Sequence, residues 1–202
     1  MPPAPLTIGR VHYEGGGDWY NNPSSLPNLL RAIRERTTLQ TTERERVVRL
    51  TDPALPDVPY LYMTGHGNVF WSPEDVRALR RHLEGGGFLH ADDCYGMDHS
   101  IRREIVKVFP GEPFVDVPLA HPIYHDVYDF PRGIPKIHEH DGLPAQGFGW
   151  YLGGRLVLYY SYQSDLGDGW EDPDVHHDPA PIRELAIRMG VNLFVYGVTS
   201  GT

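Results

Sequence analysis

Short apolar segments alternate along the chain with longer stretches that have helical periodicity. Residues 6–13, 47–50 and 59–63 have the alternating or continuous apolar pattern of strands, and residues 88–91 and 113–119 continue the series. Between them, apolar residues recur every three to four positions, first in residues 26–36 and again after Ser72, after Asp98 and in 181–198. This alternation predicts an α/β domain with a mostly parallel sheet covered by helices on both faces.

The second half of the chain departs from this alternation. Residues 147–152 and 155–162 are joined by Gly153 and Gly154, which predicts a β-hairpin with a two-residue turn. We therefore expect a single domain over residues 1–202, with residues 128–178 as an irregular and hairpin-containing insertion.

Polar side chains follow four of the predicted strands. Asp18, His66, the pair Asp92 and Asp93, and His121 each come soon after a strand ends. The carboxyl ends of parallel strands share one edge of the sheet, where ligands bind in open α/β folds. The sequence therefore predicts a site at which these four loops converge.

Acidic and histidine side chains at this edge suggest a catalytic centre. Carboxylate and imidazole groups suit zinc, manganese or iron, so His66, Asp92 and His121 are the predicted ligands of a divalent transition metal. Asp92, Asp93 and His66 are the predicted catalytic residues, acting through bound metal or as general acid and base. The alternative is that these groups form a structural network of hydrogen bonds.

Aromatic and amide side chains are predicted to bind the ligand. The glycine-rich loop 15–17 leads into Asp18, Trp19 and Tyr20, and glycine lets a ligand approach the backbone closely. Its spacing matches no nucleotide-binding fingerprint, so we expect no nucleotide cofactor. The remaining predicted ligand-binding residues are Asn68, Tyr95 and Trp170. Ordinary packing of these aromatic rings in the core is the alternative.

Two further polar stretches leave their role open. One contains His138, Glu139 and His140, and the other is the acidic, histidine-bearing stretch 165–178. The second stretch is either a metal-binding loop or a solvated surface loop.

Charge and composition narrow the partners. The 202 residues carry a formal net charge of -9, which disfavours nucleic acid and anionic membranes as partners and leaves a small molecule. No segment has the length of a membrane span or the pattern of a leader peptide, which predicts a cytoplasmic protein for the sequence as given, or an exported one if a leader precedes it. The single cysteine excludes an internal disulfide, and the oligomeric state stays open.

Four segments carry a resemblance to a known family: 15–20 (Gly-Gly-Gly-Asp-Trp-Tyr), 64–67, 86–93 and 121–123. They resemble a bacterial domain family of unknown function, over about residues 8–199, which is similar to the class I glutamine-amidotransferase-like superfamily near the trehalose-utilisation-like proteins. The resemblance implies a flavodoxin-like three-layer sandwich and no particular activity. Relatives are often exported or joined to membrane-anchored regions.

The amidotransferase chemistry does not carry over to this sequence. That superfamily has a nucleophile in a Gly-x-Cys-x-Gly turn and a later His-x-Glu, whereas Asp92 stands where the first glycine belongs, two residues before Cys94. Neighbouring carboxylates also oppose formation of a thiolate. We therefore expect a metal- or carboxylate-assisted hydrolase of a small polar substrate rather than a glutaminase. The alternative is a non-catalytic module that binds a carbohydrate or another small molecule, and a cysteine hydrolase ranks below both.

Overall fold

Two parallel strands, β3 (Tyr60–Gly65) and β4 (Phe88–Asp93), form the centre of the molecule, and every residue in both is buried. Burial on both faces explains why they read as continuous apolar runs rather than as alternating ones. The structure is a computed structural model that describes residues 4–201. Within those residues a single seven-stranded sheet extends from this centre in both directions.

The strand order is β2-β1-β3-β4-β7-β6-β5. The other strands are β1 (Ile8–Val11), β2 (Arg46–Val48), β5 (Val115–Asp116), β6 (Gln146–Leu152) and β7 (Arg155–Tyr162). The first five strands in this order pair in parallel, and β6 and β5 add two antiparallel pairings at one edge. The 2-1-3-4 order followed by one more parallel strand is that of flavodoxin-like folds, which confirms the predicted fold class.

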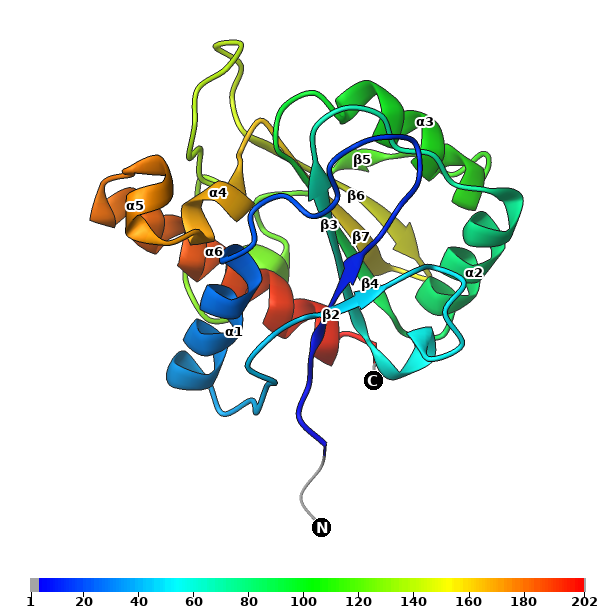
Figure 1. Ribbon diagram of the computed structural model, residues 1–202, viewed down its shortest axis with the longest axis horizontal. Helices are drawn as coiled ribbons and strands as arrows, with labels where there is room; N and C mark the ends of the chain where they lie inside the picture. The colour runs from blue at the N-terminus through cyan, green and yellow to red at the C-terminus, as the bar shows by residue number, and fades with distance from the viewer. Residues whose placement is uncertain (1–3, 202) are drawn as a thin grey trace.

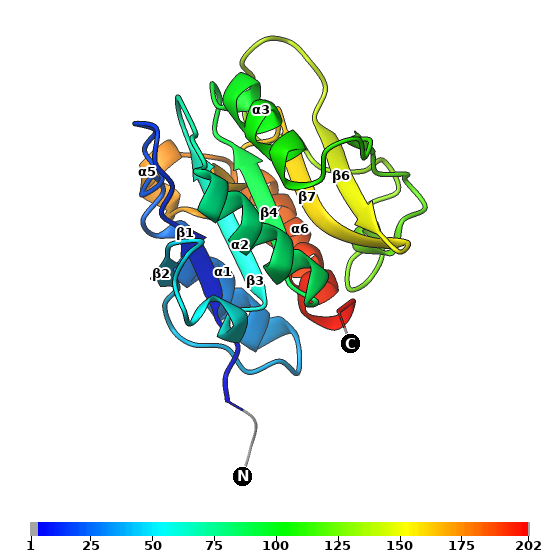
Figure 2. The ribbon, with the colours of Figure 1, turned by 90° about the vertical axis from the view of Figure 1, so that its right-hand side faces the viewer.

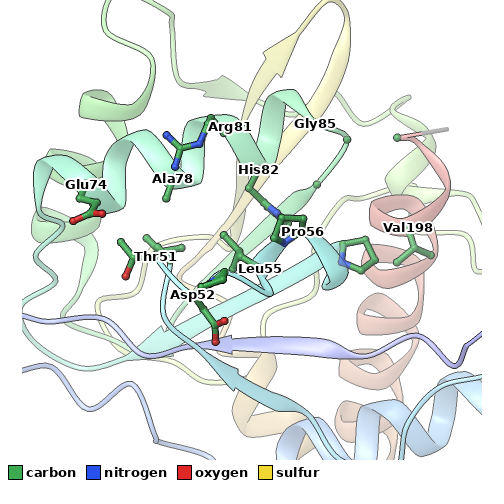
Figure 3. Close-up of a pocket in the computed structure, with 16 residues that line it drawn as sticks. Thr51, Asp52, Leu55, Pro56, Glu74, Ala78, Arg81, His82, Gly85 and Val198 are labelled. Carbon is green, nitrogen blue, oxygen red and sulfur yellow. The ribbon is translucent and has the colours of Figure 1, made fainter.

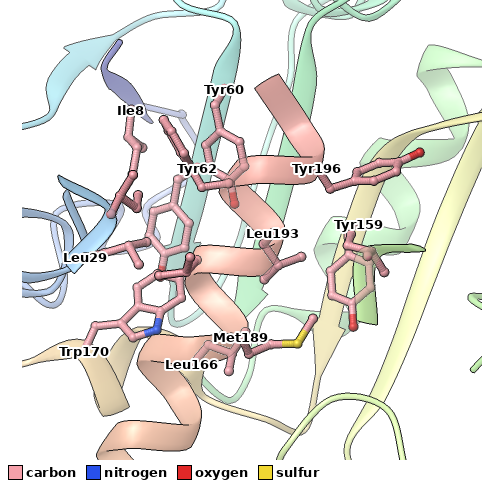
Figure 4. Packing of buried hydrophobic residues seen from close by; sticks show 14 of the residues in the cluster. Ile8, Leu29, Tyr60, Tyr62, Tyr159, Leu166, Trp170, Met189, Leu193 and Tyr196 are labelled. Carbon is pink, nitrogen blue, oxygen red and sulfur yellow. The ribbon is translucent and has the colours of Figure 1, made fainter. Parts of the chain in front are cut away.

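Helices cover both faces of the sheet (Figures 1 and 2). On one face lie α1 (Ser25–Arg36) and the long α6 (Ala180–Thr199), and on the other lie α2 (Pro73–Glu84) and α3 (Asp98–Val108). Helix α2 begins with a capping box formed by Ser72 and Asp75. Each face has its own apolar core, and Figure 4 shows the one beneath α6, where Tyr60, Tyr62 and Trp170 pack together.

The predicted hairpin is confirmed, and the predicted strand 113–119 is mostly wrong. Gly153 and Gly154 both have positive φ angles, as a tight turn between β6 and β7 requires. Only Val115 and Asp116 form a strand, because Pro113 and Pro118 on either side cannot donate to a sheet. This strand pairs with β6 at the outer edge of the sheet, outside the parallel part.

Arg102 stabilises the packing of α3 on the hairpin. Its guanidinium carbon lies 4.5–5.6 Å from the centres of four aromatic rings, and its Nε lies 2.6 Å from the carboxylate of Asp98. The four rings belong to Phe114, Phe148, Tyr160 and Tyr162.

We expect Arg102→Ala to lower the free energy of unfolding by about 1–2 kcal/mol, because cation–π contacts and packing of the aliphatic stem are both lost. Urea unfolding of the two proteins measures this loss. Arg77→Ala is the matched control, since Arg77 is exposed on the neighbouring α2. Equal losses in both variants would show that the four rings contribute nothing specific.

Candidate functional site

Asp18 and His66 are brought together at the carboxyl edge of the sheet. The carboxylate of Asp18 accepts a hydrogen bond from the backbone N–H of His66, and its second oxygen lies 2.9 Å from His66 Nδ1. The glycine-rich loop therefore closes over the loop that follows β3. The His66 side chain is 50% exposed, and among residues 4–201 no third histidine, cysteine or acidic side chain joins it and Asp18 to form a possible metal site.

Asp92 is completely buried inside the protein. Its Oδ2 accepts hydrogen bonds from the Tyr62 hydroxyl (3.1 Å) and the Gly167 N–H (2.7 Å), and its Oδ1 accepts one from the Ser161 hydroxyl. Burial, together with the carboxylates of Asp165 and Asp168, raises its pKa to about 7, against the opposing effect of these hydrogen bonds. With its polar contacts made inside the protein, Asp92 belongs to a structural hydrogen-bond network, which is the alternative that the sequence analysis leaves open for it.

Asp93 points to the opposite face of the sheet from Asp92, as neighbouring residues in a strand must. Its carboxylate accepts a hydrogen bond from the N–H of Met97 at the start of α3, 3.2 Å away. Burial raises its pKa to about 6. The two adjacent carboxylates therefore do not share one site.

His121 lies away from the carboxyl edge. Its ring packs against Tyr151 near the end of β6 and against Tyr196, which itself packs on Phe88 at the beginning of β4. Its Nδ1 accepts a hydrogen bond from the N–H of Ile123. The predicted ligand set of His66, Asp92 and His121 does not come together, because β5 lies at the outer edge and the chain after it crosses the α6 face.

The predicted ligand-binding residues divide into exposed and buried ones. Tyr20 and Tyr95 are 65% and 45% exposed, whereas Trp19 stacks on His12 with ring centres 4.1 Å apart. Asn68 donates to the Gly15 carbonyl and so holds the glycine-rich loop. Trp170 cannot line a surface pocket, because it is fully buried and its indole N–H donates to the Ala186 carbonyl.

A second cluster at this edge comes from the two polar stretches whose roles the sequence leaves open. We call the five residues His138, Asp165, Asp168, His176 and Asp178 the His/Asp cluster. Asp168 lies on α4 (Leu166–Trp170), His176 ends α5 (Pro173–His176), and His138 comes from the loop before β6 (Figure 1). One ligand atom from each of His138, Asp168 and His176 lies within 4.8 Å of the other two.

His138 is at the centre of the His/Asp cluster. Its Nδ1 lies 3.1 Å from Asp168 Oδ2 and 3.5 Å from Asp165 Oδ2, and its Nε2 lies 3.0 Å from the Asp178 carboxylate. The carboxylates of Asp165, Asp168 and Asp178 raise the pKa of His138 to about 10. A single imidazole therefore faces three carboxylates, which favour its protonated, positively charged form.

Asp168 is oriented by the protein. Its Oδ1 accepts hydrogen bonds from the Asn22 side chain (2.6 Å) and the Cys94 thiol (3.1 Å), while its Oδ2 faces His138 Nδ1 and, at 3.8 Å, His176 Nε2. Burial opposes ionisation of Asp168, but the hydrogen bonds from His138 and Cys94 hold its pKa below the ordinary value. One oxygen is thus fixed by the protein and the other is directed at two imidazoles.

An orphaned buried oxygen and backbone strain also mark this region. Asp165 is 1% exposed, and its Oδ1 has no hydrogen-bond partner although its Oδ2 contacts His140. Left-handed backbone in residues other than glycine costs about 1–3 kcal/mol and gathers at functional sites. In residues 4–201 it occurs at Asn22, Tyr95, Gln163, Asp165 and His177. Asp165 belongs to the His/Asp cluster, Gln163 and His177 lie within two residues of its members, and Tyr95 follows Cys94. Asn22 is far away along the chain, but its side chain donates to Asp168.

The Cys94 thiol donates a hydrogen bond to Asp168 Oδ1, 3.1 Å away. Burial, followed by the Asp168 carboxylate, raises the pKa of its thiol far above the ordinary value. We expect an aromatic disulfide reagent at pH 7.5 to react with folded protein at least about 100-fold more slowly than with the chain in guanidinium, because the thiolate is the reacting form. Rapid stoichiometric reaction of the folded protein would instead restore the cysteine-hydrolase alternative.

A cavity lies elsewhere, at the amino edge of the sheet. It measures about 560 Å³ and lies between η1 (Leu55–Asp57), the end of α2 and the last turn of α6 (Figure 3). Its walls combine prolines and leucines with Arg81 and His82. None of the residues of the His/Asp cluster lines it, so this cavity and the titratable groups belong to different parts of the molecule.

Fold and site together define a flavodoxin-like α/β protein with a His/Asp cluster at the carboxyl edge of its sheet. The chain belongs to the family described as Domain of unknown function (DUF4159), whose match covers residues 7–198. Comparison with curated proteins gives no significant match. No helix within residues 4–201 combines the length and apolar character needed to cross a membrane.

Proposed function

We propose that the protein is a metal-dependent hydrolase of a small polar substrate, with a divalent transition ion held by His138, Asp168 and His176. The observation that carries this proposal is that the two carboxylate oxygens of Asp168 have different partners. Its Oδ1 is occupied by Asn22 and Cys94, so that only Oδ2 is available to an ion. A ligand held in this way needs little rearrangement to bind.

The distances in the cluster support this assignment. The two imidazole nitrogens lie 3.1 and 3.8 Å from Asp168 Oδ2. Ligand atoms around one tetrahedral zinc are roughly 3.3 Å apart, given bonds of roughly 2.0–2.1 Å. Two imidazoles and one carboxylate also leave coordination positions open, as catalytic zinc and iron sites require.

The surroundings of the three ligands support the same reading. The second nitrogen of His138 faces the Asp178 carboxylate, and a metal-bound histidine almost always donates its other N–H to such a group. A bound ion would lower the pKa of a water molecule and so supply a nucleophile near neutral pH. The free Oδ1 of Asp165 is our proposed proton acceptor, in place of Asp92 and Asp93.

Membership of the class I glutamine-amidotransferase-like superfamily is part of the proposal, without its chemistry. The strand order and the position of Cys94 just after β4 support a common fold. The raised pKa of the Cys94 thiol argues against glutaminase activity.

The test is hydrolysis by protein purified without a metal-affinity tag, stripped with chelator and reloaded with zinc, manganese or ferrous ion. Against a panel of esters, amides and glycosides, we expect turnover only in the reloaded protein. Asp168→Asn should abolish it, Asp165→Asn should lower kcat, and Asp18→Asn is the control near the same edge. Equal turnover by the stripped and the reloaded protein would overturn the proposal.

A non-catalytic binding module is the second candidate, and Tyr95 favours it. The exposed ring of Tyr95 stacks on His140 with centres 4.3 Å apart, and its hydroxyl donates to Asp141. A ring fixed in this way offers a flat face to a sugar or another small ligand. Saturable ligand binding without any turnover in the metal-loaded protein would favour this function.

A further inference from the structure

The short helix α4 carries Asp168, the carboxylate ligand of the proposed metal centre, and all five residues of the helix are buried. A helix of this length has little stability of its own, so its position depends on the contacts that hold it. The way in which α4 is attached to the sheet therefore decides where Asp168 lies.

A direct hydrogen bond attaches the start of α4 to the central strand. Asp92, in β4, accepts from the N–H of Gly167 at 2.7 Å, and Gly167 immediately precedes Asp168. The same oxygen accepts from Tyr62 in β3. The carboxylate itself is held from its other side by Ser161 of β7, whose hydroxyl lies 2.8 Å from His90 Nε2. Three neighbouring strands thus contribute to one fixed acceptor.

Gly167 packs so closely against the Asp92 carboxylate that no larger residue fits there. A Cβ atom added there would lie 3.0 Å from Asp92 Oδ2 and 3.0 Å from the side-chain nitrogen of Asn22, and it would overlap the Tyr62 hydroxyl. Asn22 is also the residue that donates to Asp168 Oδ1. The backbone of Gly167 and the carboxylate of Asp168 are therefore located by the same small group of side chains.

We propose that Asp92 is a positioning residue of the metal centre, which fixes the carboxylate of Asp168 through the amide of Gly167. This inference rests on the proposed function, because it assigns to Asp92 the task of presenting a ligand of that centre. Asp92 does not touch the ion or the substrate. It is the buried acceptor that keeps α4 in the one position from which Asp168 Oδ2 faces both imidazoles.

The test compares binding of Co²⁺, followed through its visible absorption, by intact protein and four variants. Asp92→Asn keeps an acceptor for the Gly167 N–H, and Tyr62→Phe removes a neighbouring donor while leaving that bond in place. We expect both to bind Co²⁺ within about threefold of wild type. Asp92→Ala should bind about 10–100-fold more weakly, the usual cost of losing a partner that orients a ligand, with a changed spectrum.

Gly167→Ala provides a second route if Asp92→Ala does not fold. The added methyl pushes α4 away from Asp92 and should weaken Co²⁺ binding about tenfold, while circular dichroism stays that of the wild type. Folded Asp92→Ala or Gly167→Ala protein that binds Co²⁺ like wild type, with the same spectrum, would overturn the inference. Failure of the wild-type protein to bind Co²⁺ at all would instead overturn the proposed function.

Discussion

Replacing His138 with glutamine is expected to lower the affinity for Zn²⁺ by more than about 100-fold, since loss of a direct ligand costs at least as much as loss of a group that orients one. His138 Nδ1 is the imidazole atom nearest to Asp168 Oδ2, at 3.1 Å. Titration calorimetry of metal-free protein measures the change. Circular dichroism of the variant checks that the fold is intact.

The matched control for this prediction is His66→Gln. His66 is the histidine that the sequence favours as a ligand, and in the structure it contacts Asp18 at the same edge of the sheet. We expect the His66 variant to retain the wild-type affinity within about threefold, a difference that separates a bystander from a ligand. The reverse pattern, loss with His66→Gln and none with His138→Gln, would move the centre to the Asp18 and His66 pair.

Metal-free wild-type protein is expected to lose stability relative to Asp92→Asn as the pH rises from 5 to 8. The folded protein holds a proton on Asp92 up to a pKa of about 7, whereas the ordinary value is 3.8. The folded state therefore binds more protons than the unfolded chain in this window. The stabilising contribution is full below about pH 4 and is lost as the pH passes through 7.

The size of this effect follows from the linkage between proton binding and folding. Each pH unit inside the window changes the free energy of unfolding by at most about 1.4 kcal/mol. Asparagine cannot ionise and keeps an acceptor oxygen, so the variant should gain about 2 kcal/mol on the wild type between pH 5 and pH 8. Urea unfolding of both proteins at the two pH values measures the difference.

A difference that does not change with pH would contradict a raised pKa at Asp92. The other charged and titratable groups that influence this region, among them Asp165 and Asp168, are the same in both proteins and cancel in the comparison. Asp93→Asn serves as a second comparison, because its pKa of about 6 gives a narrower window.

Most elements of the fold could be predicted from the sequence because their signals are local. The capping box at Ser72, the turn glycines Gly153 and Gly154, and the apolar runs of β3 and β4 each specify their own element. The sequence predicts too long a strand at β5, because the apolar pattern of residues 113–119 does not show how far the two prolines on either side shorten the strand. Burial of α4 could not be predicted, since its two glycines and Asp168 give it the composition of a surface loop.

The sequence places its candidate site at the carboxyl edge of the sheet, and the structure brings a different set of residues together there, His138, Asp168 and His176. The stretch around His138 ends just before β6 and the stretch 165–178 begins just after β7, so the hairpin must bring them together, as the pairing of Gln146 with Tyr162 shows. The order of these segments along the chain therefore indicates the contact, although the two stretches are far apart in the sequence.

Asp92 shows what the sequence alone could not reveal. Strand alternation could have separated Asp92 from Asp93, because adjacent residues face opposite sides of a sheet. No local pattern indicates that Ser161 and Gly167, about seventy residues further on, would supply the partners of Asp92. Contacts between residues far apart in the sequence decide whether a carboxylate is available to bind a ligand or is used in a structural hydrogen bond.

The most direct test of the metal centre is anomalous diffraction at the zinc edge from crystals of the zinc-loaded protein. The account predicts one peak, bounded by His138 Nδ1, Asp168 Oδ2 and His176 Nε2, and no peak there in crystals of Asp168→Asn. A zinc peak beside His66 and Asp18, or no peak at any site at saturating zinc, would contradict it.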